Sequence, residues 1–206
     1  MCIRDRAYPS QVIKDDETEL ELNFKQGQIK GINNNSYKNP VEAIEALNVT
    51  GSEYGIGRGV HVGDTIIGIK GRVGFEAAAP ILILKAHEAL EKHVLTKWQI
   101  YWKEQLANWY GMLLHEGQYL EPVMRNIESF LEDTQATVNG SVKIKLAPRR
   151  FEIIGIESEN DLMNSKFGQY GEMPSDWTSD DARGFAKIMA NQISIFRKVN
   201  NGKKKS

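Results

Sequence analysis

Cysteine is nearly absent from this sequence, which has 206 residues and a single cysteine, Cys2. One thiol at the extreme N-terminus forms neither an internal disulfide nor a multi-cysteine zinc site, and such scarcity is typical of a reducing compartment. An excess of either charge is also missing, because 26 lysines and arginines face 27 aspartates and glutamates and the net charge is −1. A balanced surface provides no broad basic field, so the sequence predicts no nucleic-acid partner.

Long apolar runs are missing as well. No stretch approaches the roughly 20 residues that cross a bilayer, and the first six residues, MCIRDR, contain no apolar core of a signal peptide. The only run of like charge is Lys203–Lys205, which is more typical of a solvated end than of a nucleic-acid-binding arm. The sequence therefore predicts a cytoplasmic protein with no membrane partner.

Familiar catalytic motifs are absent too. The sequence has no G-x-x-x-x-G-K-[ST] phosphate loop, no H-E-x-x-H zinc helix and no G-x-S-x-G nucleophile elbow. The glycines of Gly55–Gly59 look like a phosphate cradle, but no helical pattern follows them to supply a helix N-terminus. The histidines His61, His87, His93 and His115 are widely spaced, and we interpret them as ordinary interior or surface residues rather than as metal ligands.

Alternation of apolar and polar residues predicts two hairpins. Each consists of a strand of period two, a turn rich in glycine or proline, and a return strand. The predicted segments are Thr18–Phe24, Gln26-Gly27 and Ile29–Ile32, and then Ser141–Leu146, Pro148–Arg150 and Phe151–Ile154.

Helical spacing of apolar residues, together with cap residues and prolines at the starts, predicts five helices. The predicted helices run from Asn39-Pro40 to about Asn48, from beyond Pro80 to about Val94, from the possible capping box Thr96-x-x-Gln99 to about Glu116, from Pro122 to about Leu131, and from a cap at Ser179 or Asp180 to about Val199.

Glycine is concentrated in Tyr54–Pro80, which holds 7 of the 18 glycines in the chain, interleaved with β-branched residues. Glycine weakens helices and permits positive φ, so this segment is expected to form strands with bulges and tight turns. Hairpins and grouped helices without regular βαβ alternation predict an α+β fold. We expect a mainly antiparallel sheet with packed helices and a long protruding C-terminal helix.

A group of aromatic residues lies on the helix predicted after Thr96. Trp98, Tyr101, Trp102 and Trp109 share one helical face. Such a face can stack on nucleic-acid bases, but a packed core or a subunit contact explains it better. The remaining candidates for a site are the charged residues of the glycine-rich segment, which name no reaction by themselves: Arg58, Asp64, Lys70, Arg72 and Glu76.

The glycine-rich segment resembles the argininosuccinate synthase family. The string Tyr54-Gly-Ile-Gly-Arg58 is followed at fixed spacing by Gly68-Ile-Lys70-Gly-Arg72 and Phe75-Glu76, where the family reads approximately HGIGR and then GxKSRGxYE. The likeness runs from about Ala7 to Val199 without large gaps. Further matching strings, in the same order, are Ala86-His87, Trp109-Tyr110, Leu113–Tyr119, Val138–Val142, Gly155–Ser158 and Asp180–Phe185.

This resemblance implies a role in arginine biosynthesis. The family joins citrulline to aspartate with ATP, giving argininosuccinate, AMP and pyrophosphate, and its members are homotetramers about twice this length. Their first half carries the nucleotide-binding SGGLDTS-type loop, which is absent here. The resemblance thus implies that ATP and its Mg²⁺ bind to the other half, and that this chain alone binds neither and is inactive. It also implies a leader at residues 1–6 that is foreign to the family, a synthetase and multimerisation domain at 7–178, and an oligomerisation helix with a basic tail at 179–206.

The resemblance further implies where citrulline binds. The family contributes the Glu of its VEN motif and the Tyr of its GxYE motif, and these positions fall on Gly63 and Phe75. Asp64 lies one residue away and supplies the carboxylate only if the strand carries a bulge or a shifted register. Phe75 keeps the ring and loses the hydroxyl. The substrate-binding candidates are therefore Asp64, Phe75, Arg72 and Glu76, in a divergent branch of the family, although an Arg–Glu pair is more often structural than ligand-binding.

Two alternatives remain open from the sequence. The chain is part of an amidine-forming ligase, or it is a non-catalytic module for oligomerisation or small-ligand binding. An SGGLDTS-type segment directly upstream in the same reading frame would distinguish them.

Overall fold

The structure, a computed structural model, describes residues 13–163 and 176–201. The leader that the resemblance implies at residues 1–6 lies outside these residues. Contacts divide the chain into two compact units, Met1–Leu162 and Met163–Ser206. The described elements of the first unit are β1 (Thr18–Lys25), β2 (Gln28–Ile32), β3 (Asn35–Ser36), α1 (Pro40–Glu53), β4 (Arg58–Asp64), β5 (Lys70–Glu76), α2 (Ala78–Val94), α3 (Lys97–His115), α4 (Pro122–Gln135), β6 (Gly140–Ala147) and β7 (Arg150–Glu157).

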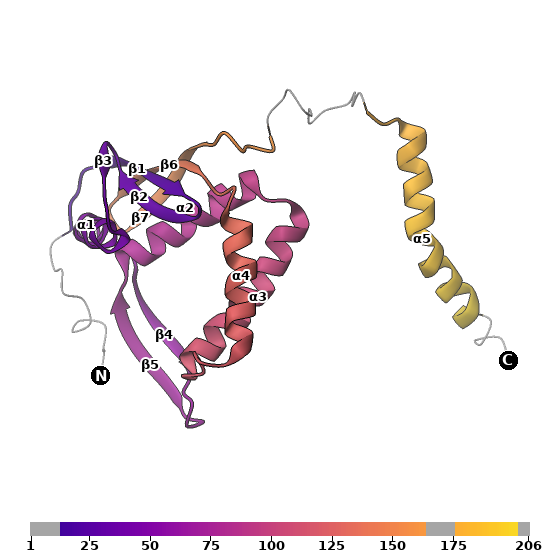
Figure 1. Cartoon of the computed structure of the whole chain (residues 1–206), viewed down its shortest axis with the longest axis horizontal. Helices are drawn as coiled ribbons and strands as arrows, with labels where there is room; N and C mark the ends of the chain where they lie inside the picture. The colour runs from indigo at the N-terminus through magenta and orange to yellow at the C-terminus, as the bar shows by residue number, and fades with distance from the viewer. Residues whose placement is uncertain (1–12, 164–175, 202–206) are drawn as a thin grey trace. The chain divides into compact units, whose positions relative to one another are not determined.

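A five-stranded antiparallel sheet is central to the first unit, with the strand order β3-β2-β1-β6-β7 (Figure 1). Both predicted hairpins are confirmed as β1–β2 and β6–β7. The β1–β2 turn is tight because Gln26 and Gly27 both take positive φ, at 49° and 72°. Helices and antiparallel sheets together confirm the α+β class.

The core lies on one face of this sheet. Along β1, Leu20, Leu22 and Phe24 are buried, as the period-two pattern predicts. Helix α1 packs on β2 and α2 packs on β1 and β6, so that the two helices cover the same face. The residues between the buried positions of β1 are polar, which is typical of an antiparallel sheet with one solvated face.

Helix α1 continues to Glu53, and the predicted end near Asn48 is wrong. Asn39 caps the helix as expected, because its side-chain oxygen accepts a hydrogen bond from Val41 N at 2.9 Å. The extra turn contains Gly51, where an added Cβ would lie 2.9 Å from the Ala78 Cβ of α2. Close packing of two helices thus outweighs the weak helix propensity of this turn.

Helices α3 and α4 lie side by side in Figure 1 and pack against each other. The Thr96–Gln99 capping box at the start of α3 is confirmed. The aromatic face of α3 is exposed, so the explanation of that face as packed core is wrong for the described residues. The opposite face of the helix takes the contact with α4, where the Tyr110 hydroxyl donates to Glu128 Oε1 at 2.9 Å.

The glycine-rich segment forms the antiparallel hairpin β4–β5, which is a two-stranded sheet of its own. Figure 1 shows it extending away from the five-stranded sheet. Its register runs without a shift from Arg58↔Glu76 to Asp64↔Lys70. The strands are therefore as predicted, whereas the expected bulges do not occur between these residues.

The second unit contains the helix α5 (Ser179–Asn201). Its cap is Thr178 rather than Ser179 or Asp180, because Asp181 N donates to Thr178 Oγ1 and the Asp181 carboxylate accepts from Thr178 N at 2.9 Å. The Thr178 hydroxyl also donates to Asp181 Oδ2 at 2.7 Å, and this bond, followed by the one from Thr178 N, lowers the pKa of Asp181. Its apolar stripe includes Phe185, Ile188 and Phe196, all exposed. Within the described parts of the chain, helices that combine the length and the hydropathy needed to cross a bilayer do not occur.

Candidate functional site

The base of the β4–β5 hairpin is closed by an ion pair. Arg58 Nε lies 3.2 Å from Glu76 Oε1, and the Glu76 side chain is only 3% exposed. This partner differs from the Arg72 that the sequence motif suggested. Next to the pair, Gly57 takes a φ of 74°, and its carbonyl accepts from Ala77 N at 3.0 Å. The hairpin thus emerges at a fixed position directly before α2.

The register of the hairpin assigns each side chain to one of two faces. Cross-strand partners share a face, and alternate residues along a strand point to opposite faces. The first face, called here the Phe75 face, carries Phe75, His61 and Gly63. Gly59 lies on it too, and an added Cβ at Gly59 would be 3.6 Å from Phe75 Cζ. The second, the Arg58 face, carries Asp64, Lys70, Arg72 and Glu76.

The structure therefore separates the predicted citrulline contacts. Phe75 is on one face, whereas Asp64, Arg72 and Glu76 are on the other. Asp64 pairs with Lys70 near the turn, where both side chains are largely exposed. The shifted register that would bring Asp64 beside Phe75 does not occur, because Gly63 pairs with Gly71 in an unbroken ladder.

Unlike Asp64, the position that the resemblance assigns to the family Glu lies on the same face as Phe75. Gly63 lies on the Phe75 face, so the two substituted positions share a face even though neither carries the family side chain. His61 lies on that face too, and its Nε2 is 2.6 Å from where a Cβ on Gly63 would be. The sequence alone assigns His61 no role, because its place on this face depends on strand pairing.

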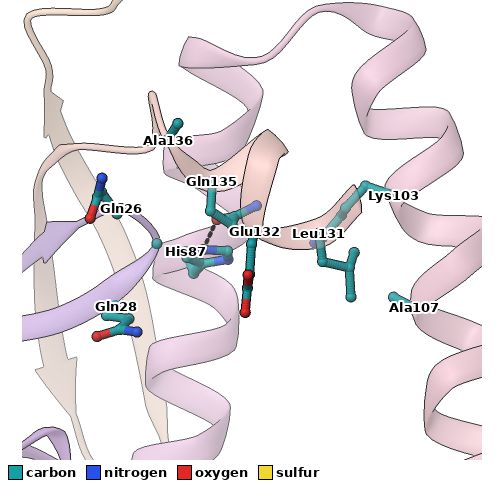
Figure 2. Close-up of a pocket in the computed structure, with 10 residues that line it drawn as sticks. Gln26, Gln28, His87, Lys103, Ala107, Leu131, Glu132, Gln135 and Ala136 are labelled. Atoms are coloured by element: carbon teal, nitrogen blue, oxygen red, sulfur yellow. Dashed lines mark hydrogen bonds between the residues drawn. The ribbon is translucent and has the colours of Figure 1, made fainter. Parts of the chain in front are cut away.

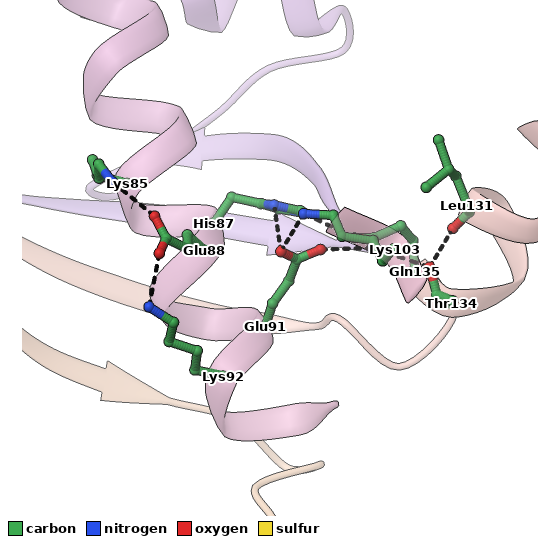
Figure 3. A network of polar contacts seen from close by, with 9 residues as sticks. All are labelled: Lys85, His87, Glu88, Glu91, Lys92, Lys103, Leu131, Thr134 and Gln135. Carbon is green, nitrogen blue, oxygen red and sulfur yellow. Dashed lines mark hydrogen bonds and ion pairs between the residues drawn. The ribbon is translucent and has the colours of Figure 1, made fainter. Parts of the chain in front are cut away.

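A second polar cluster joins α2, α3 and α4 (Figure 3). Its centre is Glu91, a carboxylate that is only 4% exposed. Lys103 Nζ lies 2.7 Å from Glu91 Oε2, and Gln135 Nε2 donates to Glu91 Oε1 at 2.8 Å. His87 Nε2 lies 2.8 Å from Gln135 Oε1, while its Nδ1 is 3.6 Å from Glu91 Oε2. A buried charge is tolerated here because it is both paired and hydrogen-bonded.

Sequence reasoning missed this cluster. One signal was available: Glu91 occupies an apolar stripe of α2 between Leu90 and Val94, where an acid requires a partner. The partners come from α3 and α4, and the sequence does not show which cation meets Glu91.

The cluster lines a shallow cavity of about 590 Å³ (Figure 2). Lys103 and His87 already contact protein groups, so the cavity offers mainly side-chain amides and Glu132 to a ligand. In the part of the chain that the structure describes, no three His, Cys, Asp or Glu residues are grouped as a metal site requires. The residues lining the cavity are Gln26, Gly27, Gln28, His87, Lys103, Ala107, Leu131, Glu132, Gln135 and Ala136.

Burial lowers the pKa of His87 below 6.5, although Glu91 opposes the shift and Lys103 adds to it. The groups facing this imidazole are Glu91 on its own helix, Lys103 on α3, Gln135 on α4 and the Phe24 ring on β1. The folded state keeps His87 neutral at a pH where the unfolded chain protonates it. Stability is therefore lost as the pH falls through about 6.5, and the loss ends below the folded pKa.

We expect the His87→Gln variant to reduce this acid sensitivity. A glutamine cannot be protonated, so the free energy of unfolding should fall less between pH 7.5 and pH 5.5 than in the unmodified chain. Urea titrations at each pH measure this difference. His115→Gln, at the exposed end of α3, is the matched control. If the free energy of unfolding falls equally between these pH values in the His87→Gln variant and in the unmodified chain, His87 does not cause the acid sensitivity.

Comparison with known proteins agrees with the motifs of the hairpin. Residues 6–196 match the family described as "Arginosuccinate synthase C-terminal domain". The argininosuccinate synthase of Xanthomonas axonopodis pv. citri is 35% identical over 199 residues, which are 97% of this chain and 46% of that protein. That of Dictyoglomus thermophilum is 36% identical over 180 residues, 86% of this chain and 44% of the relative.

A third relative matches in the same way. The argininosuccinate synthase of Methanocaldococcus jannaschii is 33% identical over 191 residues, which are 92% of this chain and 48% of the relative. The chain thus spans about half the length of the curated relatives it matches. It belongs to the argininosuccinate synthase family and corresponds to the C-terminal part of its members.

Proposed function

We propose that this chain is the synthetase and multimerisation part of an ATP-dependent ligase that condenses citrulline and aspartate to argininosuccinate, with AMP and pyrophosphate as the other products. The observation that carries the proposal is the match to argininosuccinate synthases over 97% of the chain. The β4–β5 hairpin, which carries the motif residues, supports this proposal. The Arg58–Glu76 ion pair fixes the base of the hairpin directly before α2.

ATP and Mg²⁺ do not fit the residues of this chain. The sequence lacks the SGGLDTS-type loop, and the described residues contain no cluster of acids or histidines suited to a metal. We therefore assign both to the part of the relatives that this chain does not match. The balanced charge and the single cysteine support the proposal of a cytoplasmic enzyme.

Citrulline is proposed to meet the hairpin on the Phe75 face. Phe75 can pack its ring against the substrate, and the His61 ring lies beside Gly63, where the family has a carboxylate. Glu76 acts as a positioning residue, because its ion pair with Arg58 fixes the hairpin base. Asp64 and Arg72 contact substrate only if it extends around the strands onto the Arg58 face.

A reconstitution experiment tests the ligase function. The 206-residue chain alone should release no pyrophosphate from ATP, citrulline and aspartate above a heat-killed control. Fused behind the nucleotide-binding half of the Xanthomonas synthase, it should produce argininosuccinate. That half alone is the second control. A correctly folded fusion without argininosuccinate would favour the alternative, a non-catalytic module for oligomerisation or ligand binding.

The face assignment predicts the effect of restoring one hydroxyl. In the active fusion, Phe75→Tyr should lower the citrulline KM by about 2- to 13-fold, since one hydrogen bond contributes about 0.5–1.5 kcal/mol. Asp64→Ala on the opposite face is the matched control, and it should leave the KM nearly unchanged. A 10-fold or larger rise in the citrulline KM with Asp64→Ala would instead show that the Asp64 carboxylate contacts citrulline, in the role of the family Glu.

We further propose that the enzyme is a homotetramer and that α5 contributes to its assembly. Several large apolar side chains of α5 are exposed on one stripe, and leaving them in water forfeits roughly 1.5–3 kcal/mol each. Deletion of residues 179–206 should lower the oligomeric state measured by light scattering. An intact tetramer after this deletion would refute the role of α5.

A further inference from the structure

One face of α3 carries a group of exposed aromatic residues. Trp98, Tyr101, Trp102 and Trp109 are 47–63% exposed, and Met112 at the end of the stripe is also exposed. Their rings form edge-on contacts, with centroids 5.9 Å apart for Trp98–Tyr101 and 5.4 Å apart for Tyr101–Trp102. The helix meets α4 through its other side. Among the described elements of the first unit, none covers the aromatic stripe.

The spacing of the residues along the stripe is symmetric about its centre. Its central line is Trp98, Tyr101, Gln105, Trp109 and Met112, so the intervals are three, four, four and three residues. A face with this spacing is complementary to itself when a second identical helix lies antiparallel on it, with Gln105 at the midpoint. Self-complementarity of one patch is the requirement for a two-fold symmetric interface.

We propose that α3 forms a two-fold contact with α3 of a second copy of this chain. Gln105 then lies beside Gln105 of the second copy, on the axis. Trp98 packs opposite Met112, and Tyr101 opposite Trp109. Two facing amides hydrogen-bond across the axis, and one polar pair in an apolar seam fixes its register. Trp102 lies beside the central line and adds apolar contact.

The area is sufficient for a specific contact. A fully covered aromatic side chain buries 150–250 Å², and roughly half of that remains to be buried here. Four aromatic residues and Met112 give about 500 Å² per copy, or about 1,000 Å² in total, at the lower end of specific interfaces. A contact of this size suits one of several interfaces in a larger assembly. The inference thus deepens the proposed homotetramer, on which it rests.

Cross-linking at the axis tests the arrangement. In a Cys2→Ser background, Gln105→Cys should form a disulfide dimer on mild oxidation, because only residues at the axis meet their own copies within the roughly 4 Å between Cβ atoms that a disulfide needs. Glu104→Cys is the matched control, since it is an exposed neighbour off the stripe. Non-reducing gels should show dimer for Gln105→Cys and monomer for Glu104→Cys. Equal cross-linking of the two variants, or none, overturns the proposal.

Two further variants separate this contact from the other proposals. Trp109→Glu, at an exposed position, should keep the circular dichroism spectrum and remove the cross-link of Gln105→Cys. Deletion of residues 179–206 should leave that cross-link in place even if it dissociates the tetramer. Argininosuccinate formation by the fusion is measured separately, so its absence does not affect the result. A cross-link that persists in Trp109→Glu would contradict an aromatic interface.

Discussion

Replacing Gly57 with alanine is expected to lower the free energy of unfolding by about 2–5 kcal/mol. Gly57 has a φ of 74°, in the left-handed region, where a side chain costs about 1–2 kcal/mol. An added Cβ would also lie 2.4 Å from Ala77 O and 2.8 Å from Ala78 N. Both atoms belong to the backbone at the start of α2, so the neighbour cannot rotate away and the helix must move.

Chemical denaturation followed by circular dichroism measures this loss. Gly68→Ala is the matched control, because Gly68 has nearly the same φ, 76°, but nothing within 4 Å of an added Cβ. That variant should lose at most about 1–2 kcal/mol. The difference between the two variants isolates the close approach of Gly57 to α2. Equal losses would mean that the hairpin base tolerates a side chain.

The Glu91→Ala variant should be destabilised by about 3–5 kcal/mol, because removing one partner leaves the other charge of a buried pair uncompensated. Lys103 would lose its counterion at 2.7 Å and Gln135 its acceptor at 2.8 Å. This expected loss of stability is larger than the loss from breaking a surface ion pair, which contributes about 0–1 kcal/mol. Lys85→Ala is the control, since it removes an exposed partner of Glu88 on the same helix.

A double variant tests the explanation. Glu91→Leu combined with Lys103→Met removes both charges, and apolar replacement of a buried pair is often close to neutral. The double variant should therefore be more stable than Glu91→Ala in urea titrations. If its stability is as low as that of Glu91→Ala, the loss comes from packing and not from the unpaired Lys103.

Most of the fold was predictable because local patterns and tertiary packing agree. The period-two pattern of β1 and the cap at Asn39 depend on neighbours in the sequence, and both are confirmed. The end of α1 was not predictable, because Gly51 is held in the helix by its contact with Ala78. Local propensity favoured ending the helix earlier, and packing of α1 on α2 outweighed it.

The candidate site shows the same limit. The motif residues of the hairpin were identifiable from sequence, whereas their faces depend on register. A shift by one residue exchanges the two faces of a strand, so Asp64 is a near neighbour of Gly63 in sequence and on the opposite side of the hairpin in the structure. The Arg58 partner of Glu76 is likewise determined by cross-strand pairing. Residue type indicated the chemistry, and strand pairing determined which groups can act together.

The pairing of β1 with β6 has a consequence for synthesis of the protein. The strands meet near Gln26 and Asn139, which are hydrogen-bonded although 113 residues apart. At about 5–20 residues per second, a ribosome needs roughly 6–23 s to make the intervening chain. During that time the edge of β1 that pairs with β6 has no partner, although β2 can already pair with the other edge. Nascent chains of this protein therefore expose one edge of an apolar strand for seconds, and an open strand edge is a site where another chain can pair.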